Sequence, residues 1–499
     1  MSAAPIATAD ENPAPLRRRR WGLALGALGA LALLALPAPE GMSAAAWRTV
    51  AVAALMAVWW ATEAIPVAAT ALLPLVLFPA LGIAGIEAAA APFGNAVIFL
   101  FLGGFVLALA VERWLLHRRI ALVLLLRIGH SPASVIAGLM LASAFISMWI
   151  SNTATVMLLL PIATAVVAAL APGFDPAHPP AGPARDFAAA LVLGVAYAAT
   201  IGGVGTLIGT PPNALFSAFV ADTQKAPIGF GEWMAVGVPV AAVMLAAAFL
   251  VLTRLVFPAA RRVPWFRDGA TLSGLAATLP PASAAEKRVA AIFLLAALLW
   301  VGRPLLVRAG LDGLTDAGIA VGCALLTFLV PAGSAPGRLM NWESLGRLPW
   351  GILILFGGGL SLADAFVDSG LAAWIGARTT GLGEVEPLAV MVAVAVVVVF
   401  LSELMSNTAL AATFLPVAAA IATGLGASPI WLAVVVALGS SLAFMLPVGT
   451  PPNAIVYATG YLTMAQMIRA GLWLNAIGIA VAVAAAWWLA PLVLGYPRP

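Results

Sequence analysis

The chain has 499 residues, of which 63% are hydrophobic and 9% are charged, with a mean hydropathy of +1.08. Soluble domains are closer to half apolar and a quarter charged, so this composition excludes them, and the long apolar runs exclude a disordered chain. The single cysteine, Cys323, excludes a disulfide framework and a cysteine metal cluster. The sequence therefore predicts an all-α polytopic membrane protein.

Eleven runs have the length and apolar character of a membrane-spanning helix, which needs roughly 20 mainly apolar residues. Residues 1–21 are expected to form a cytoplasmic tail. A cytoplasmic linker at 259–286 is expected to separate two halves, 22–258 and 287–499. The predicted spans are 22–37, 46–62, 66–86, 94–112, 186–222, 232–257, 287–306, 315–331, 348–368, 428–461 and 470–494.

Two further apolar stretches, 133–170 and 386–425, are too long for one helix and carry Ser-Asn-Thr in their middle. Broken backbone is tolerated at membrane depth only where protein or a watery cavity surrounds it, so we predict a re-entrant hairpin at each. The runs 186–222 and 428–461 both contain Gly-Thr-Pro-Pro-Asn. Two prolines remove two backbone donors, which predicts that each of these helices is broken.

The basic residues indicate the orientation of the chain. Most of the 24 Lys and Arg residues fall in loops that share one face of the membrane if the N-terminus is cytoplasmic. Cytoplasmic loops carry an excess of basic residues, so we expect this orientation, with hairpin 133–170 entering from inside and hairpin 386–425 from outside. The Ala-, Gly- and Arg-rich usage favours a bacterial inner membrane.

The chain contains an internal duplication. Ser147–Ala154 recurs 255 residues later as Ser402–Ala409, and Gly209–Ala214 recurs as Gly449–Ala454. The predicted spans give the two copies opposite orientations in the membrane. Inverted-topology repeats with interrupted helices are typical of secondary transporters, whose substrate site lies near the bilayer midplane.

Each Ser-Asn-Thr motif offers two hydroxyls and an amide beside free backbone groups at helix ends. Oxygen atoms of this kind suit a small hard cation such as Na⁺, while N–H groups at a helix N-terminus suit an anion. The alternative is that these residues form ordinary interhelical hydrogen bonds, and that Thr-Pro-Pro-Asn is a simple proline kink. Two copies at matching positions of a duplication favour the paired binding element.

Few acidic residues fall at membrane depth. Glu63 lies at a predicted helix end, where a boundary role is expected, and Asp364 is a candidate tie between helices. Glu403 lies inside the second motif, where carrying a proton, shaping a cation site and structural hydrogen bonding all remain open. The sequence has no Walker loop and no Ser-His-Asp triad, so it lacks the residues of an ATP-driven pump or a hydrolase.

Together these motifs resemble the divalent anion/sodium symporter family, which includes the INDY-like dicarboxylate transporters. The resemblance runs over roughly 46–494. It is carried by Ser151-Asn152-Thr153, Ser406-Asn407-Thr408 and the two Thr-Pro-Pro-Asn segments, with support from Trp59–Pro66 and Pro349–Gly359.

The resemblance implies a homodimer of about eleven spans plus two hairpins, with scaffold and transport domains that work by an elevator movement. It implies that one Na⁺ is held by Ser147, Ser151, Asn152 and the Gly209 carbonyl, and a second by Ser402, the Met405 carbonyl, Asn407 and the Gly449 carbonyl. The implied substrate contacts are Asn152, Thr153, Asn407, Thr408, Thr450 and Pro451.

The resulting functional hypothesis is sodium-coupled symport of C4 dicarboxylates such as succinate, malate or fumarate, with no enzymatic activity. The neutral oxygen ligands at every inferred cation position favour sodium coupling. Two alternatives remain open at this point. One is dicarboxylate exchange without sodium, and the other is transport of another divalent anion such as sulfate or citrate.

Overall fold

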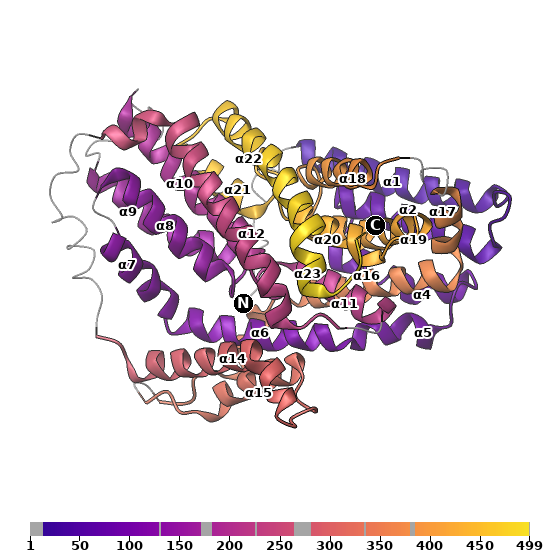
Figure 1. Cartoon of the computed structure of the whole chain (residues 1–499), viewed down its shortest axis with the longest axis horizontal. Coiled ribbons are helices and arrows are strands. Elements are labelled where there is room, and N and C mark those ends of the chain that lie inside the picture. Colours follow the sequence, from indigo (N-terminus) through magenta and orange to yellow (C-terminus); the bar gives the residue numbers. More distant parts are fainter. Residues whose placement is uncertain are drawn as a thin grey trace, which may run out of the picture.

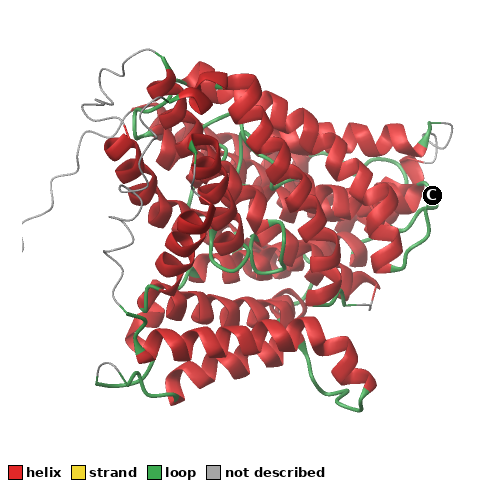
Figure 2. Ribbon diagram, turned by 60° about the vertical axis from the view of Figure 1, so that its left-hand side comes forward, coloured by secondary structure: helices red, strands yellow, loops and turns green. Residues whose placement is uncertain are grey.

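The computed structural model describes residues 13–128, 131–170, 182–224, 227–263, 281–333, 336–379 and 385–498. Over these ranges the chain is built from helices and connecting loops, without a β-strand (Figure 2). One isolated β-bridge joins Pro331 to Arg338. The predicted all-α class is therefore confirmed.

Twelve α-helices of the first half lie among the described residues. They are α1 (Pro13–Ala35), α2 (Ala44–Thr62), α3 (Val67–Thr70), α4 (Leu73–Ala80), α5 (Ile86–Ala90), α6 (Ala96–Arg113), α7 (Leu116–Ile128), α8 (Pro132–Ser147), α9 (Asn152–Leu170), α10 (Pro183–Gly203), α11 (Pro211–Gln224) and α12 (Phe230–Leu250).

The helices of the second half repeat much of this order. They are α14 (Ala284–Arg308), α15 (Asp316–Leu329), α16 (Trp350–Asp368), α17 (Leu371–Thr379), α18 (Pro387–Ser402), α19 (Asn407–Gly424), α20 (Pro429–Gly439), α21 (Pro451–Tyr457), α22 (Met464–Ala484) and α23 (Ala490–Leu494). Short 3₁₀ turns lie at Ala91–Gly94, Pro258–Arg262 and Trp342–Arg347.

Eight helical stretches among the described residues are long and apolar enough to cross a membrane, and shorter apolar helices accompany them. The structure differs from the sequence prediction at two places. The expected span 66–86 is divided into α3 and α4. Residues 13–21 of the expected tail are helical, because Pro13 begins α1 and arginine is a good helix former. Residues 1–12 and 264–280, from the expected tail and linker, lie outside the described residues.

The duplication is visible in where helices begin and end. α8 and α18 both have 16 residues and both begin with proline at the first helical position, which suits a residue without an N–H. α7 and α17 begin at Leu116 and Leu371, the same 255 residues apart. Both α12 and α22 continue into a π-helical turn, at Val251–Val256 and Ala485–Leu489. The two halves therefore share helix boundaries as well as sequence motifs.

The two halves interlock rather than lie side by side. α10 packs against α8 and α9, and α20 packs against α18 and α19. Each half also reaches across to the other, since α9 packs against α21 and α11 packs against α19. The segments that carry the two copies of the motifs therefore meet inside the molecule.

The pair α14 and α15 lies along the side of this interlocked group. Figure 1 shows the two helices running beside α6, and α15 makes an extensive contact with α6. α16 packs on the other face, against α11 and α19. α6, α14, α15 and α16 thus surround the elements that carry the motifs.

Glycine permits a close contact between α10 and α8. A methyl group built on Gly202 of α10 would stand 2.2 Å from the carbonyl oxygen of Ala144 and 2.5 Å from its Cα. Backbone atoms cannot yield as a flexible side chain can, so any side chain here forces the two helices apart.

Gly202→Ala is expected to destabilise the protein by about 1–3 kcal/mol, the usual cost of overpacking. The measurement is the midpoint of thermal unfolding of the purified protein in detergent. Gly302→Ala on α14 is the matched control, because a methyl there meets no atom within 4 Å and alanine favours helix by up to about 1 kcal/mol. An unchanged midpoint for Gly202→Ala would contradict the close contact.

Candidate functional site

The first hairpin breaks between Ser147, the last residue of α8, and Asn152, the first of α9. The Ser147 hydroxyl is buried and donates a hydrogen bond of 2.7 Å to Asn152 Oδ1. The Ser151 hydroxyl accepts from the Ala154 N–H at 3.3 Å, which satisfies one of the free donors at the start of α9. The bond from Ser147 to Asn152 joins the two sides of the tip and fixes the direction of the Asn152 amide.

The first helix break separates α10 from α11 at residues 204–210. Breaking a helix leaves carbonyl groups without partners, and the Asn213 side chain satisfies several of them. Its Nδ2 donates to the carbonyls of Gly203, Val204 and Thr206 at 3.1, 3.2 and 2.7 Å. The unwound turn is therefore held by an amide from inside the protein.

Neutral oxygen atoms gather where this tip meets this break. A methyl group built on Gly203 would stand 2.5 Å from Asn152 Oδ1 and 3.1 Å from the Gly209 carbonyl oxygen. A methyl built on Gly209 would stand 2.4 Å from the Gly203 carbonyl oxygen. The three oxygen atoms therefore lie close together, and the lack of a side chain at both glycines permits this approach. Hydroxyl, amide and carbonyl oxygens are suitable ligands for a small hard cation.

The second hairpin breaks between Ser402 and Asn407, the residues equivalent to Ser147 and Asn152. Here the serine hydroxyl turns to its own helix and donates to the Val399 carbonyl at 2.7 Å. Asn407 Oδ1 is buried without a hydrogen-bond partner. The second tip therefore presents an amide oxygen whose bonding capacity is unused.

The second helix break repeats the first. Asn453 Nδ2 donates to the carbonyls of Ala443 and Leu446 at 3.2 and 3.1 Å, which are 10 and 7 residues before it. Asn213 reaches the same two positions in the first half. The Thr450 hydroxyl accepts from the Asn453 N–H at 3.4 Å and caps α21. The asparagine of Thr-Pro-Pro-Asn is thus the residue that stabilises each break.

The structure brings some of the predicted cation ligands together. Ser147, Asn152 and Gly209 meet at the first oxygen cluster. Among the described hydrogen bonds, none joins Ser402, Met405 or Asn407 to Gly449. The predictions from sequence omitted three residues: Gly203, which borders the cluster, and Asn213 and Asn453, which hold the breaks. The repeated asparagine in both motif copies was the available signal for the last two.

The predicted substrate residues lie at helix starts that the interlocked packing brings into contact. Asn152 and Thr153 open α9, which packs against α21, the helix that follows Thr450 and contains Pro451. Asn407 and Thr408 open α19, which packs against α11. Free N–H groups at the starts of α9 and α19 favour an anion.

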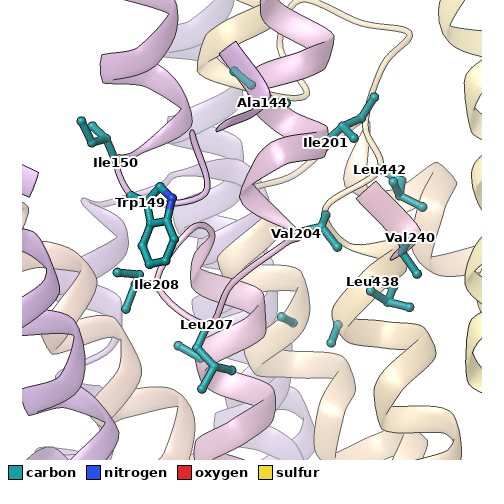
Figure 3. Packing of buried hydrophobic residues seen from close by; sticks show 14 of the residues in the cluster. Ala144, Trp149, Ile150, Ile201, Val204, Leu207, Ile208, Val240, Leu438 and Leu442 are labelled. Atoms are coloured by element: carbon teal, nitrogen blue, oxygen red, sulfur yellow. The ribbon is translucent and has the colours of Figure 1, made fainter. Parts of the chain in front are cut away.

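An aromatic stack fastens the first tip to its surroundings. The Trp149 ring lies 6.0 Å from Phe230 of α12 and 5.0 Å from Phe293 of α14, and Phe230 stacks on Trp300 at 4.4 Å. Figure 3 shows Trp149 and Ile150 in this tip beside Ile208 of the first break. Leu404, the equivalent of Trp149 in the second tip, is 59% exposed.

A cavity of about 910 Å³ lies away from the motifs, between α16 and α17 on one side and α11 and α19 on the other. Its lining includes the carboxylates Asp222, Asp364 and Asp368 together with apolar residues such as Phe219 and Pro416. None of the predicted ion or substrate residues borders it. The cavity marks a loosely filled boundary between two groups of helices.

The ion pairs of the described residues lie outside both tips and breaks. Arg119 pairs with Glu286, Arg347 pairs with Glu112, and Arg303 contacts Asp316 at 3.2 Å. In α7 the His117 ring is buried, and burial lowers its pKa below the usual value. The first oxygen cluster lies away from these charged groups and consists of one amide oxygen and two backbone carbonyl oxygens, which are neutral.

The fold is that of a polytopic helical membrane protein in which a broken hairpin and a broken helix each occur twice. The family model for the sodium:sulfate symporter transmembrane region matches residues 18–494, and the chain belongs to this family.

Its relatives include proteins named sodium-dependent dicarboxylate transporter SdcS. The protein of this name from Staphylococcus saprophyticus is 39% identical over 481 residues, which cover 95% of this chain and 92% of the relative. The one from Staphylococcus aureus is 39% identical over 482 residues with the same coverage. The predicted family is therefore confirmed.

Solved structures share the fold at low sequence identity. The Alcanivorax borkumensis YdaH transporter matches with a TM-score of 0.53 and 14% identity, covering 97% of this chain and 98% of that one. Neisseria gonorrhoeae MtrF matches with a TM-score of 0.53 and 15% identity, covering 95% and 94%. This likeness concerns the fold alone.

Gly203→Ala is expected to abolish cation binding at the first cluster, because its methyl would stand 2.5 Å from Asn152 Oδ1 and displace that oxygen. The measurement is the rise in unfolding midpoint when NaCl replaces choline chloride, which we expect for the wild type and not for the variant. Gly138→Ala on α8 is the control, since its methyl meets its nearest atoms at 3.6 Å. A full sodium effect in Gly203→Ala would remove this cluster from the cation site.

Proposed function

We propose that the protein is a secondary transporter that couples the uptake of C4 dicarboxylates, such as succinate, malate or fumarate, to sodium. The observation that carries this proposal is the cluster of Asn152 Oδ1 with the Gly203 and Gly209 carbonyl oxygens. Relatives covering nearly the whole chain and named sodium-dependent dicarboxylate transporters support the choice of ion and substrate.

In this proposal the first cation is bound by Asn152 and Gly209, with Ser147 and Ser151 from the first tip. The second is bound by Ser402, Met405, Asn407 and Gly449 of the second half. The dicarboxylate lies between them, in contact with Asn152, Thr153, Asn407, Thr408, Thr450 and Pro451. Bound sodium ions neutralise the dianion, because both tips lack basic residues. In this proposal the Asn152 amide contacts both ligands: its oxygen faces the cation, and its nitrogen donates to a carboxylate of the substrate.

The transport cycle in this proposal is an elevator movement. α8–α12 and α18–α22 form the transport domain, which moves against a scaffold that includes α6 and α14–α16. The interlocked packing of α9 on α21 and α11 on α19 supports movement of these helices as one body. The cavity at the boundary of α16 and α17 with α11 and α19 supports sliding there. We also propose that the protein is a homodimer with a cytoplasmic N-terminus. It is proposed to transport its substrate without enzymatic activity.

The family description also names sulfate, so a second divalent anion is a specific alternative. The two substrates differ in shape, because a C4 dicarboxylate carries its two charges on separate groups and sulfate is one compact dianion. Competition between labelled succinate and excess unlabelled sulfate or citrate separates these cases. An exchanger that works without sodium would instead need a dicarboxylate on the inner side.

Proteoliposomes containing the purified protein are expected to accumulate labelled succinate when an inward sodium gradient is applied. Replacing external sodium by potassium should reduce the initial rate to that of empty liposomes, because the proposed coupling ion is then absent. Uptake at an equal rate in potassium would disprove sodium coupling.

Asn152→Ala and Asn407→Ala are each expected to reduce succinate uptake to the background rate while the protein still reaches the membrane. Each change removes an amide that faces the proposed ligands, and neither deletes an apolar contact of the core. Thr164→Ala on α9 and Thr413→Ala on α19 are matched controls, since these hydroxyls donate within their own helices, to the carbonyls of Pro161 and Ala409. Uptake by either asparagine variant at the wild-type rate would exclude that residue from the site.

A further inference from the structure

Glu403 is a buried carboxylate at the second hairpin tip, with 3% of its surface exposed. Its Oε1 accepts hydrogen bonds from the N–H groups of Phe444 and Met445 at 2.7 and 2.8 Å, and its Oε2 accepts from that of Leu446 at 2.9 Å. Asn475 Nδ2 of α22 adds a fourth bond at 2.8 Å. An ionised carboxylate only accepts hydrogen bonds, and this set of four donors suits it.

These bonds join the second tip to the second helix break. Phe444, Met445 and Leu446 lie in the non-helical segment between α20, which ends at Gly439, and α21, and this segment leads to Gly449. A methyl group built on Gly449 would stand 3.1 Å from Glu403 Oε2, so the carboxylate reaches the backbone of the residue whose carbonyl is a proposed cation ligand. The negative charge therefore lies next to the second ion position.

The first half joins its tip to its break without a charge. The residue equivalent to Glu403 is Met148, and its carbonyl oxygen accepts a hydrogen bond from the Thr206 hydroxyl. That hydroxyl also accepts from the Gly209 N–H at 3.1 Å. Each half therefore has one side chain that joins its tip to its break, a neutral hydroxyl in the first half and a carboxylate in the second.

Glu403 has no cationic partner in the ion pairs of the described residues. The backbone N–H groups and the Asn475 amide carry only partial charges, so the negative charge is spread but not cancelled. A charge in a low-dielectric interior acts over a longer distance than one in water. A cation bound near Gly449 is the group placed to neutralise it.

On the basis of the proposed function, we propose that Glu403 is a positioning residue that sets the sodium affinity of the second site. It holds the segment from Phe444 to Leu446 against the tip and supplies a negative charge behind the Gly449 carbonyl. The two sodium sites are consequently unequal, and the second one binds sodium more tightly than the first. Glu403 touches neither the sodium ion nor the dicarboxylate.

The test is the sodium dependence of succinate uptake by Glu403→Gln in proteoliposomes. The sodium concentration for half-maximal uptake is expected to rise about tenfold, as for one unit charge removed from within roughly 10 Å of the ion at an effective dielectric constant of about 20. The KM for succinate, measured at saturating sodium, is expected to stay within about twofold of the wild type. An unchanged sodium requirement would overturn the proposal.

Thr206→Val is the matched control in the first half, because it removes the equivalent tip-to-break bond without changing any charge. If positioning alone mattered, both variants would raise the sodium requirement equally, and that result would also overturn the proposal. Glu403→Asp keeps the charge and shortens the reach, so it is expected to retain a sodium requirement within about threefold of the wild type. If Glu403→Gln does not fold, Glu403→Asp still tests the proposal, because a sodium requirement well above this threefold range would contradict the role of the charge.

Sodium binding can also be followed without transport. The rise in unfolding midpoint with increasing NaCl is expected to need about tenfold more sodium in Glu403→Gln than in the wild type. If the wild type responds to sodium but takes up no dicarboxylate, the proposed substrate fails while this inference is still decided by the variants. An equal sodium response in wild type and Glu403→Gln would overturn it independently of uptake.

Discussion

The structure depends on satisfying the backbone groups that two broken helices expose inside an apolar interior. An unpaired carbonyl or N–H there costs free energy comparable to a lost hydrogen bond, so a break survives only if other groups take over. Asn213 and Asn453 do this with one amide each, reaching the carbonyls 10 and 7 residues before them. Among the hydrogen bonds of the described residues, none ends at the carbonyls of Gly209 and Gly449, the last residues but one of the two breaks. A break stabilised from within can therefore bind a ligand without unfolding.

Gene duplication explains why two such breaks meet, and the interlocked packing explains why they act together. Because α9 contacts α21 and α11 contacts α19, each hairpin is supported by the broken helix of the opposite half. Each half therefore contributes to the packing that holds the other half's tip in place. The halves have nevertheless diverged at the tips, where Met148 and Trp149 correspond to Glu403 and Leu404. Those two positions give the first tip an aromatic anchor and the second a buried charge.

The sequence was sufficient for the helical class, the family and the duplication, because hydropathy and repeated motifs are local or periodic signals. Pro211 and Pro451 begin helices in the structure, as expected of proline at a helix start. The contacts of Glu403 with Phe444 to Leu446 could not be predicted, since they join residues some 40 positions apart. Gly203 was missed for a related reason, because its importance lies in the lack of a side chain beside Asn152. Such features depend on which helices meet, and hydropathy carries no information about that.

The aromatic stack around Trp149 has a kinetic consequence. In the proposed cycle the first tip moves relative to α14, so the contacts of Trp149 with Phe293 and, through Phe230, with Trp300 must be broken and remade in every turnover. Aromatic pairs contribute roughly 0.5–1.5 kcal/mol beyond the area they bury. A barrier higher by that amount slows a step by about two- to tenfold. The stack therefore acts on the speed of the cycle and on how long the protein stays in the conformation seen here, while leaving the equilibrium accumulation of substrate to the sodium gradient.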